Sequence, residues 1–427
     1  MTIVDRNDHL DTLEGTRVAI DIGSTVIKVA RIAPDGRLLT QCFHPRDFEI
    51  GIARQVESLL PSMEPHAGHG EILLCSSANG GLRVGIVTLT PRFSGAILRD
   101  QVLVAGANPV YVHSLNDAPG HTSHVDILLV AGGIDCNDAG PLEARLRRFK
   151  PQAYSHGTLV YAGNSALAPL FVQLFPDAHV IANPLANGLT SKTGSVLEAV
   201  RRAYLDDLVY KEGVSELRDN MARGIRPTPE VVNLGFFRAV RHCSSIEVIG
   251  ACVLFDIGGA TTDLHYTVEL VRDESEEKPS AGLSVARYVF TDLGIVASRG
   301  SLMLQIRSHP RLYEFLEAAS HTDIRELYGL LREGEYEPPP ALLSYACMFL
   351  ALDRFAHGRG PGLPTADLGK LAQMMLTGGA AQGLDEAVVS RIVRLLLPES
   401  ANPPPIFIDR QYQMWVDGIT WSERGAL

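Results

Sequence analysis

The chain has 427 residues, of which 46% are hydrophobic and 20% charged, a globular composition in a chain too long for one ordinary core. Its formal net charge of −11 argues against binding to the phosphate backbone of nucleic acids, which requires a positive field. No apolar run approaches the roughly 18 residues of a membrane-spanning helix, the first fifteen residues lack a signal-peptide core, and the six cysteines form no CxxC pair. We therefore expect a two-lobed cytoplasmic protein without nucleic-acid or membrane partners.

The first informative segment is residues 16–34, which read as a β-hairpin. The apolar run Val18–Ile20 ends at Asp21, and a small polar turn leads into a second β-like run that contains Lys28. An aspartate at a strand end can hold hydrated Mg²⁺, and Lys28, seven residues later, returns past the turn and can reach a β- or γ-phosphate. Glycine in the turn lets backbone amides approach phosphate oxygens. We predict that Asp21 and Lys28 are catalytic, and that the nucleotide is bound by Gly23, Ser24, Thr25 and Lys28.

Short apolar strands then alternate with helical segments, a pattern that indicates α/β architecture. One of these strands ends in Gly132-Gly133, and Asp135 follows it. Asp135 is a candidate to orient an attacking water, with a turn-forming aspartate as the alternative. Further along, Thr228 is predicted as the N-cap and Pro229 as the first residue of a helix.

The second informative segment follows the buried strand of residues 251–255 and repeats the first. It reads Asp256-Ile257-Gly258-Gly259-Ala260-Thr261-Thr262-Asp263, again an acidic strand end followed by a glycine-rich turn. Asp256 is predicted as a catalytic residue and as a metal ligand together with Asp21. Asp263 either adds a third carboxylate at the metal or caps the turn. The expected nucleotide contacts in this half are Gly258, Gly259, Ala260, Thr261, Thr262, Thr377, Gly378, Gly379 and Ala380.

The two halves carry these signals at similar spacing. Gly132 lies 111 residues after Asp21, and Gly378 lies 122 residues after Asp256, each at the end of an apolar strand. Glycine-rich turns also serve ordinary packing, but the coincidence of four elements predicts an internal duplication in which residues 126–133 correspond to 373–380. Two hairpins that face each other would clamp a triphosphate, with Asp21 and Asp256 sharing Mg²⁺.

This arrangement resembles the actin/Hsp70/sugar-kinase superfamily. The expected fold is α/β, with two duplicated actin-like (ribonuclease H-like) lobes around a central nucleotide cleft. The expected divisions are a first lobe at 14–185, a helical inter-lobe segment at 186–247, a second lobe at 248–405, and a C-terminal strand and tail at 406–427.

Within the superfamily the chain resembles the MutL (GlmL) family of accessory proteins for coenzyme-B12-dependent glutamate mutase. The resemblance is collinear over nearly the whole chain and is most specific at Asp256–His265; Cys75–Arg83, Leu129–Asp135, Ala162–Asn164, Arg226–Pro229 and Thr377–Gly379 also carry it.

The resemblance implies an ATP- and Mg²⁺-dependent factor that reactivates or assembles an adenosylcobalamin mutase. It implies the mutase subunits as partners, with adenosylcobalamin bound only by the mutase, and we consider a homodimer possible. Two alternatives use the same cleft: a small-molecule kinase, and a nucleotide-bound scaffold that does not hydrolyse ATP.

Overall fold

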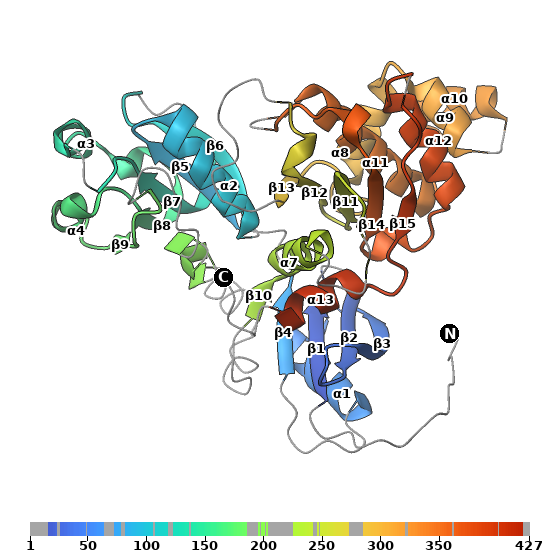
Figure 1. Ribbon diagram of the computed structural model, residues 1–427, viewed down its shortest axis with the longest axis horizontal. Coiled ribbons are helices and arrows are strands. Elements are labelled where there is room, and N and C mark those ends of the chain that lie inside the picture. Colours follow the sequence, from blue (N-terminus) through green and yellow to red (C-terminus); the bar gives the residue numbers. More distant parts are fainter. Residues whose placement is uncertain are drawn as a thin grey trace.

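The computed structural model is a mixed α/β protein with three five-stranded sheets (Figure 1). The described residues are 16–23, 26–47, 49–63, 72–77, 82–105, 107–117, 123–135, 138–185, 195–196, 198–200, 202–203, 225–241, 246, 248–272, 285–320, 323–360, 363–399 and 401–421. Two predicted nucleotide contacts, Ser24 and Thr25, and most of the segment expected to be helical before residue 225 therefore lie outside the described residues.

The first sheet has the strand order β10-β4-β1-β2-β3. Strands β1 to β3 are antiparallel neighbours, and β4 and β10 run parallel to β1. Strands β1 and β4 are nearly continuous apolar runs, because the sheet is covered on both faces. The bounds are β1 (Arg17–Ile22), β2 (Val26–Ile32), β3 (Leu38–Pro45), β4 (Ile72–Ser76) and β10 (Ile225–Pro227), with α1 (Ile52–Met63) between β3 and β4.

The second sheet has the order β13-β12-β11-β14-β15, which matches the first sheet read in reverse, as β3-β2-β1-β4-β10. Its first three strands are again antiparallel, and its last two run parallel to β11. The α/β fold with two duplicated halves is therefore confirmed. The bounds are β11 (Cys252–Ile257), β12 (Thr262–Thr267), β13 (Val285–Phe290), β14 (Gln373–Thr377) and β15 (Ile406–Ile408).

The predicted correspondence of residues 126–133 with 373–380, the segment that contains β14, is wrong. The sheet order makes β4 the counterpart of β14, because each pairs in parallel with the strand that ends in the aspartate. The strand that ends in Gly132-Gly133 belongs instead to a third sheet, with the order β6-β5-β7-β8-β9 and parallel neighbours throughout. The mistake has a physical cause: every buried parallel strand shows the same apolar run and glycine-rich exit.

We call this third sheet the middle sheet, because its strands β5 to β9 lie between β4 and β10 in the chain. Its strand order is doubly wound. Its helices are α2, α3 and α4, and a π-helical turn at Pro91–Gly95 leads into α2. The bounds are β5 (Arg83–Thr88), α2 (Ala96–Val104), β6 (Asn108–Ser114), β7 (Val125–Ala131), α3 (Gly140–Leu146), β8 (His156–Tyr161), α4 (Ala168–Leu174) and β9 (His179–Val180).

Strand membership crosses two of the expected divisions. β10 lies within 186–247 but completes the first sheet, and β15 lies within 406–427 but completes the second. We propose a first half that ends after the helix following β10, with the middle sheet as an insertion, and a second half that continues to the last described helix.

The two halves meet through two helices, each of which follows the edge strand that completes one of the duplicated sheets. α7 (Thr228–Val240) follows β10, and α13 (Gln413–Trp421) follows β15. Figure 1 shows both helices between the first and second sheets, and one apolar cluster joins them to β1, β4, β11 and β14. Ile225 and Ile408 are equivalent in strand register, because each pairs with the residue that precedes the partner of the aspartate. Gly235 and Gly418 lie ten residues after them and are therefore counterparts in the duplication. An added Cβ at Gly235 would lie 1.9 Å from the Met414 carbonyl oxygen, and one at Gly418 would lie 1.8 Å from that of Val231.

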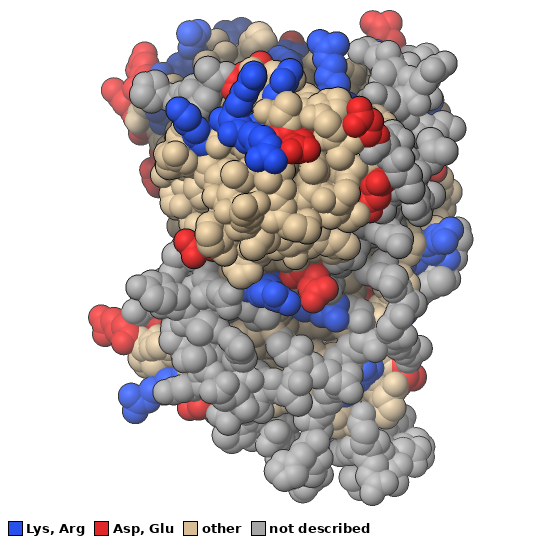
Figure 2. Space-filling model, turned by 90° about the vertical axis from the view of Figure 1, so that its left-hand side faces the viewer, with Lys and Arg blue, Asp and Glu red and all other residues tan. Residues whose placement is uncertain are grey.

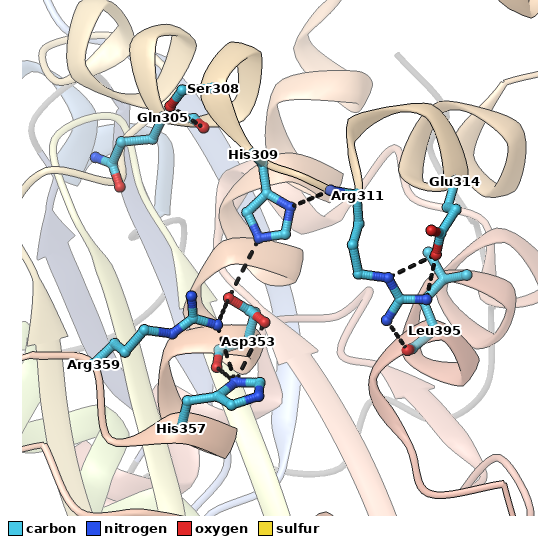
Figure 3. Close-up of polar contacts among 9 residues, drawn as sticks. All are labelled: Gln305, Ser308, His309, Arg311, Glu314, Asp353, His357, Arg359 and Leu395. Carbon is cyan, nitrogen blue, oxygen red and sulfur yellow. Dashed lines mark hydrogen bonds and ion pairs between the residues drawn. The ribbon is translucent and has the colours of Figure 1, made fainter.

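The remaining helices cover the outer face of the second sheet and form the largest apolar cluster of the chain's described part. Their bounds are α8 (Arg299–Ser308), α9 (Leu312–Ala319), α10 (Ile324–Glu333), α11 (Pro340–His357) and α12 (Glu386–Leu396). Figure 3 shows a buried carboxylate, Asp353 of α11, that connects this helix to His309 at the end of α8. Its Oδ2 lies 2.6 Å from a nitrogen of Arg359 and 3.4 Å from Nε2 of His309. Burial by itself raises the pKa of Asp353, but these partners outweigh it and hold the pKa below its usual value.

Figure 2 shows the face of the molecule on the side of the middle sheet, where blue side chains gather above a wide area without charge. Arg145, Arg147, Arg148 and Lys150 lie at or just after the end of α3, a helix of the middle sheet. Among the described residues, no helix combines the length and apolar character that crossing a membrane requires.

The crossing of α7 and α13 yields a stability prediction. Gly235→Ala and Gly418→Ala each place a methyl group against a backbone carbonyl that cannot move without separating the helices, so each should destabilise the protein by about 1–3 kcal/mol or more. Chemical denaturation measures the loss.

The matched control is Gly329→Ala in α10, where an added Cβ meets nothing within 4 Å. Alanine there should be neutral or stabilising by up to about 1 kcal/mol, because it has the higher helix propensity. Equal effects of all three substitutions would show that the crossing is not tight.

Candidate functional site

A cavity of about 480 Å³ lies where the two halves face each other, within the range of ligand-binding pockets. Its lining combines the first hairpin tip (Gly23, Val26, Lys28), the second (Asp256 to Thr261, Asp263), the ends of β4 and β10, and Gly378 to Ala380. The two hairpins that the sequence predicted therefore lie at the same cavity.

The two tips have the same local geometry. In the first, the Gly23 amide donates to the Val26 carbonyl at 3.0 Å, and in the second the Gly258 amide donates to the Thr261 carbonyl at 2.9 Å. The turn brings the residue seven positions after each aspartate back opposite it, so that Asp21 pairs with Lys28 and Asp256 with Asp263 across the strands. The spacing argument for Lys28 agrees with this register.

The Asp21 carboxylate is fully buried and bound by side chains of its own half. Its Oδ2 accepts from Lys28 Nζ at 2.6 Å, while its Oδ1 accepts from the Thr228 hydroxyl at 2.5 Å and from the Cys75 thiol at 3.5 Å. Burial by itself lowers the pKa of Lys28, but the carboxylates of Asp21 and Asp256 outweigh it and raise the pKa above the usual value. Lys28 is therefore a permanent positive charge in the cleft.

Thr228 has a different role from the predicted one. The helix begins at Thr228 itself, with Pro227 as the N-cap residue, and the threonine hydroxyl donates to Asp21 instead of capping. The preference of Thr for caps is a local tendency, and the buried carboxylate 207 positions away is the stronger acceptor.

Asp256 lines the cleft, and no described residue donates a hydrogen bond to its carboxylate. Its Oδ1 lies where a Cβ on Gly378 would be only 2.3 Å away, and Gly378 has φ of +87°, so glycine is required there twice over. Burial raises the pKa of Asp256 to about 7; Lys28 opposes the rise, and the carboxylates of Asp263 and Asp21 add to it. A cation in the cleft would relieve this excess of negative charge.

Asp263 is paired with a cation that the sequence analysis did not single out. Arg287, on the neighbouring strand β13, places a guanidinium nitrogen 2.6 Å from Asp263 Oδ1, and both side chains are buried. Burial raises the pKa of Asp263, and Arg287 opposes the rise.

The three predicted metal ligands do not form one cluster. The described residues contain no group of three His, Cys, Asp or Glu side chains that could hold a metal ion. Asp21 is bound to Lys28 and Asp263 to Arg287, which leaves Asp256 as the carboxylate open to the cleft. One carboxylate fits Mg²⁺ bound mainly by phosphate oxygens and water, the usual mode for nucleotide-bound magnesium.

Not all of the predicted nucleotide contacts line the cleft. Gly23, Lys28, Gly258, Gly259, Ala260, Thr261, Gly378, Gly379 and Ala380 do. The Thr262 hydroxyl instead donates to the Leu293 carbonyl at 2.7 Å, and the Thr377 hydroxyl donates to the Asp409 carboxylate at 3.0 Å. Both hydroxyls hold the second half together and are not offered to a ligand.

Asp135 is not brought to the cleft. It follows β7 of the middle sheet, and its Oδ1 accepts from the Ser165 amide and from the Asn183 side-chain amide, both at 2.8 Å. These contacts fit the alternative role considered for Asp135, that of an aspartate that stabilises a turn. Asp135 lies away from the cleft because β7 belongs to the middle sheet and to neither duplicated sheet.

A tyrosine from the second half reaches the first hairpin and had no signal in the sequence. Tyr412 lines the cleft, and Lys28 Nζ lies 5.2 Å from the centre of its ring. Its φ of +50° is unusual for a non-glycine residue. The residue lies in the short connection between β15 and α13, a segment whose position depends on the helix crossing.

These features define a class of protein: a two-lobed α/β protein with duplicated hairpins that face a ligand cleft. The chain belongs to the MutL protein family, whose model matches residues 17–419. It is 27% identical over 307 residues to Protein MutL from Clostridium tetanomorphum, a match that covers 66% of this chain and 65% of that protein.

Solved structures of low identity were also found. A ROK family glucokinase from Streptomyces griseus is 10% identical, with 96% of this chain and 100% of that one covered and a TM-score of 0.35. The activator of 2-hydroxyisocaproyl-CoA dehydratase from Clostridium difficile is 9% identical, with 96% and 98% covered and a TM-score of 0.35.

The Lys28–Asp21 pair yields a prediction. Lys28→Met should destabilise the protein by about 3–5 kcal/mol, because it leaves a buried carboxylate without its cation, and it should abolish ATP binding. Chemical denaturation and isothermal titration with Mg·ATP measure the two effects.

The double variant Lys28→Met/Asp21→Asn separates the two roles of the lysine. It removes both charges, so it should recover most of the stability without recovering ATP binding. Normal ATP affinity in the double variant would remove Lys28 from the site.

Asp256 yields a pH prediction. Its pKa of about 7 means that the carboxylate is mostly neutral at pH 6 and ionised at pH 8. Because Mg²⁺ binds the ionised form, affinity for Mg·ATP should rise about tenfold from pH 6 to a plateau above about pH 8. Titration calorimetry over this range measures it.

Asp256→Asn is the control, with weak and pH-independent affinity expected. Since folding raises this pKa above the unfolded value, the ionised carboxylate costs stability above about pH 4, and the cost is greatest above pH 7. The Asn variant should therefore be at least as stable as the wild type at pH 8. An unchanged pH profile in this variant would exclude Asp256 as the titrating group.

Proposed function

We propose that this protein is an ATP-dependent reactivating or assembly factor for an adenosylcobalamin-dependent mutase of the glutamate mutase type. Membership of the MutL family supports this proposal. The observation that carries it is the cleft, where two duplicated hairpin tips present a fixed cation, Lys28, and an open carboxylate, Asp256.

In this proposal each half has a separate task toward the nucleotide. Lys28 binds the β- or γ-phosphate as a point charge, and the tips supply backbone amides. Asp256 holds the Mg²⁺ that accompanies the phosphates; bound magnesium neutralises their charge. Gly378 to Ala380 border the cleft from the second half and suit the nucleoside end.

ATP turnover in such a cleft can drive the release of a damaged cofactor. An inactivated mutase keeps cobalamin tightly bound, and its release requires a factor whose affinity for the mutase differs between nucleotide states. Shifting a 1:99 equilibrium to 99:1 needs about 5.5 kcal/mol of differential binding. Closure of the two halves around the α7–α13 crossing is a hinge motion that can couple the nucleotide state to mutase binding.

The direct test is restoration of mutase turnover. Glutamate mutase loaded with hydroxocobalamin is incubated with this protein, Mg·ATP and free adenosylcobalamin, and product formation is followed. We expect turnover to return with ATP and not with a non-hydrolysable analogue. Asp256→Asn, which should fold normally, is the matched negative control.

Two outcomes would replace the proposal. A phosphorylated metabolite formed in place of free phosphate would identify a small-molecule kinase. Tight ATP binding without phosphate release, and without restoration of any mutase encoded beside it, would identify a nucleotide-bound scaffold.

A further inference from the structure

Arg287 occupies a position between three parts of the molecule. It lies on β13 of the second half and is 3% exposed. One guanidinium nitrogen donates to Asp263 Oδ1 at 2.6 Å, and another donates to the Leu103 carbonyl at 2.8 Å. Leu103 belongs to α2 of the middle sheet, so this single side chain connects the second hairpin with the inserted sheet.

The connection is made at the wall of the cleft. Asp263 and Arg287 line the cavity, and so do Ala107 and Asn108, which follow α2. Leu103 lies in the last turn of α2, where carbonyl oxygens lack helical partners and a cation is favourable. The cation that fastens the middle sheet is therefore in reach of the same cavity as the predicted phosphate contacts.

The polar groups around Arg287 are not fully satisfied. Its Nε has no hydrogen-bond partner among the described residues, and neither does Nε2 of His265, which is directly opposite on β12. Both amide atoms of Gln101, two residues before Leu103 and 2% exposed, are also without a partner in the described chain. Buried groups without hydrogen-bond partners are rare. Two of these three lie opposite each other on β12 and β13, and the third lies on α2, the helix that packs against β13.

We propose that Arg287 senses the terminal phosphate of a bound nucleotide and transmits its presence to the middle sheet. This inference rests on the proposed nucleotide function of the cleft. A guanidinium carries five donors in a planar fork that matches phosphate oxygens. When a γ-phosphate is present, Arg287 turns its fork to the phosphate and gives up the Leu103 carbonyl. The middle sheet then loses its buried hydrogen bond from the guanidinium of the second half, and α2 loosens.

Hydrogen–deuterium exchange of the full chain tests this coupling without any probe attached to the protein. Residues 96–110 are followed in the free protein, with Mg·ADP and with Mg·AMP-PNP, at concentrations that calorimetry shows to be saturating. In the wild type we expect a severalfold increase in exchange with AMP-PNP and none with ADP.

The decisive variant is Arg287→Lys, which keeps a cation beside Asp263 but lacks the fork. We expect it to bind AMP-PNP at least about tenfold more weakly, to bind ADP normally, and to show no increase in exchange at saturation. Arg287→Met/Asp263→Asn, which removes both buried charges, should give the same exchange result if the lysine variant folds poorly. The matched control is Arg299→Lys in α8, whose partner is Glu337; it should respond as the wild type does.

The outcomes separate the two proposals. If the wild type binds no nucleotide by calorimetry, the function proposed for the cleft fails, and this inference fails with it. If the wild type binds AMP-PNP but residues 96–110 exchange as in the ADP complex, only the inference about Arg287 is overturned. A normal increase in the Arg287→Lys variant also overturns it.

Discussion

The close crossing of α7 and α13 is the constraint on which the rest of the structure depends. Each helix follows the fifth strand of one duplicated sheet, and each presents a glycine to a backbone carbonyl of the other. Because no side chain separates the helices at this point, the two halves are held at one fixed distance. The hairpin tips project from the same two sheets, so this distance also sets the width of the cleft between Lys28 and Asp256. A rotation about this crossing can change the angle between the two halves, and with it the cleft, while the helices keep their close contact and each sheet keeps its own packing.

The duplicated hairpins share a backbone but have acquired different charges. Asp21 faces Lys28 in the first copy, whereas Asp256 faces Asp263 in the second. Two buried carboxylates, one carboxylate open to the cleft and two cations therefore surround the cleft, and the excess negative charge adds to the effect of burial in raising the pKa of Asp256. Identical charge pairs in both copies would leave no carboxylate open to a metal ion. The asymmetry thus gives one tip to the phosphate and the other to its cation.

The middle sheet gives the protein a third body beside the two duplicated halves. It interrupts the first half between β4 and β10, and its helix α2 packs against β13 of the second half. The inserted sheet thus contacts the half that is farther along the chain, through a buried hydrogen bond from a guanidinium to a backbone carbonyl beside the cleft. An insertion placed in this way can follow a change in the cleft while the two duplicated sheets keep their own packing.

Much of the site was predictable from local sequence. Strand, acidic end and glycine turn are short-range signals, and the return of the chain after a tight turn placed Lys28 beside Asp21. Turn chemistry also located Gly258 to Thr261 and Gly378 to Ala380, because close backbone approach requires glycine or small residues. Only the tertiary structure assigned the strand Val125–Ala131 to a separate sheet, and so placed Asp135 away from the cleft. Only packing brought Thr228, Tyr412 and Arg287 to the site, since their partners lie far away in sequence and no local periodicity records such contacts.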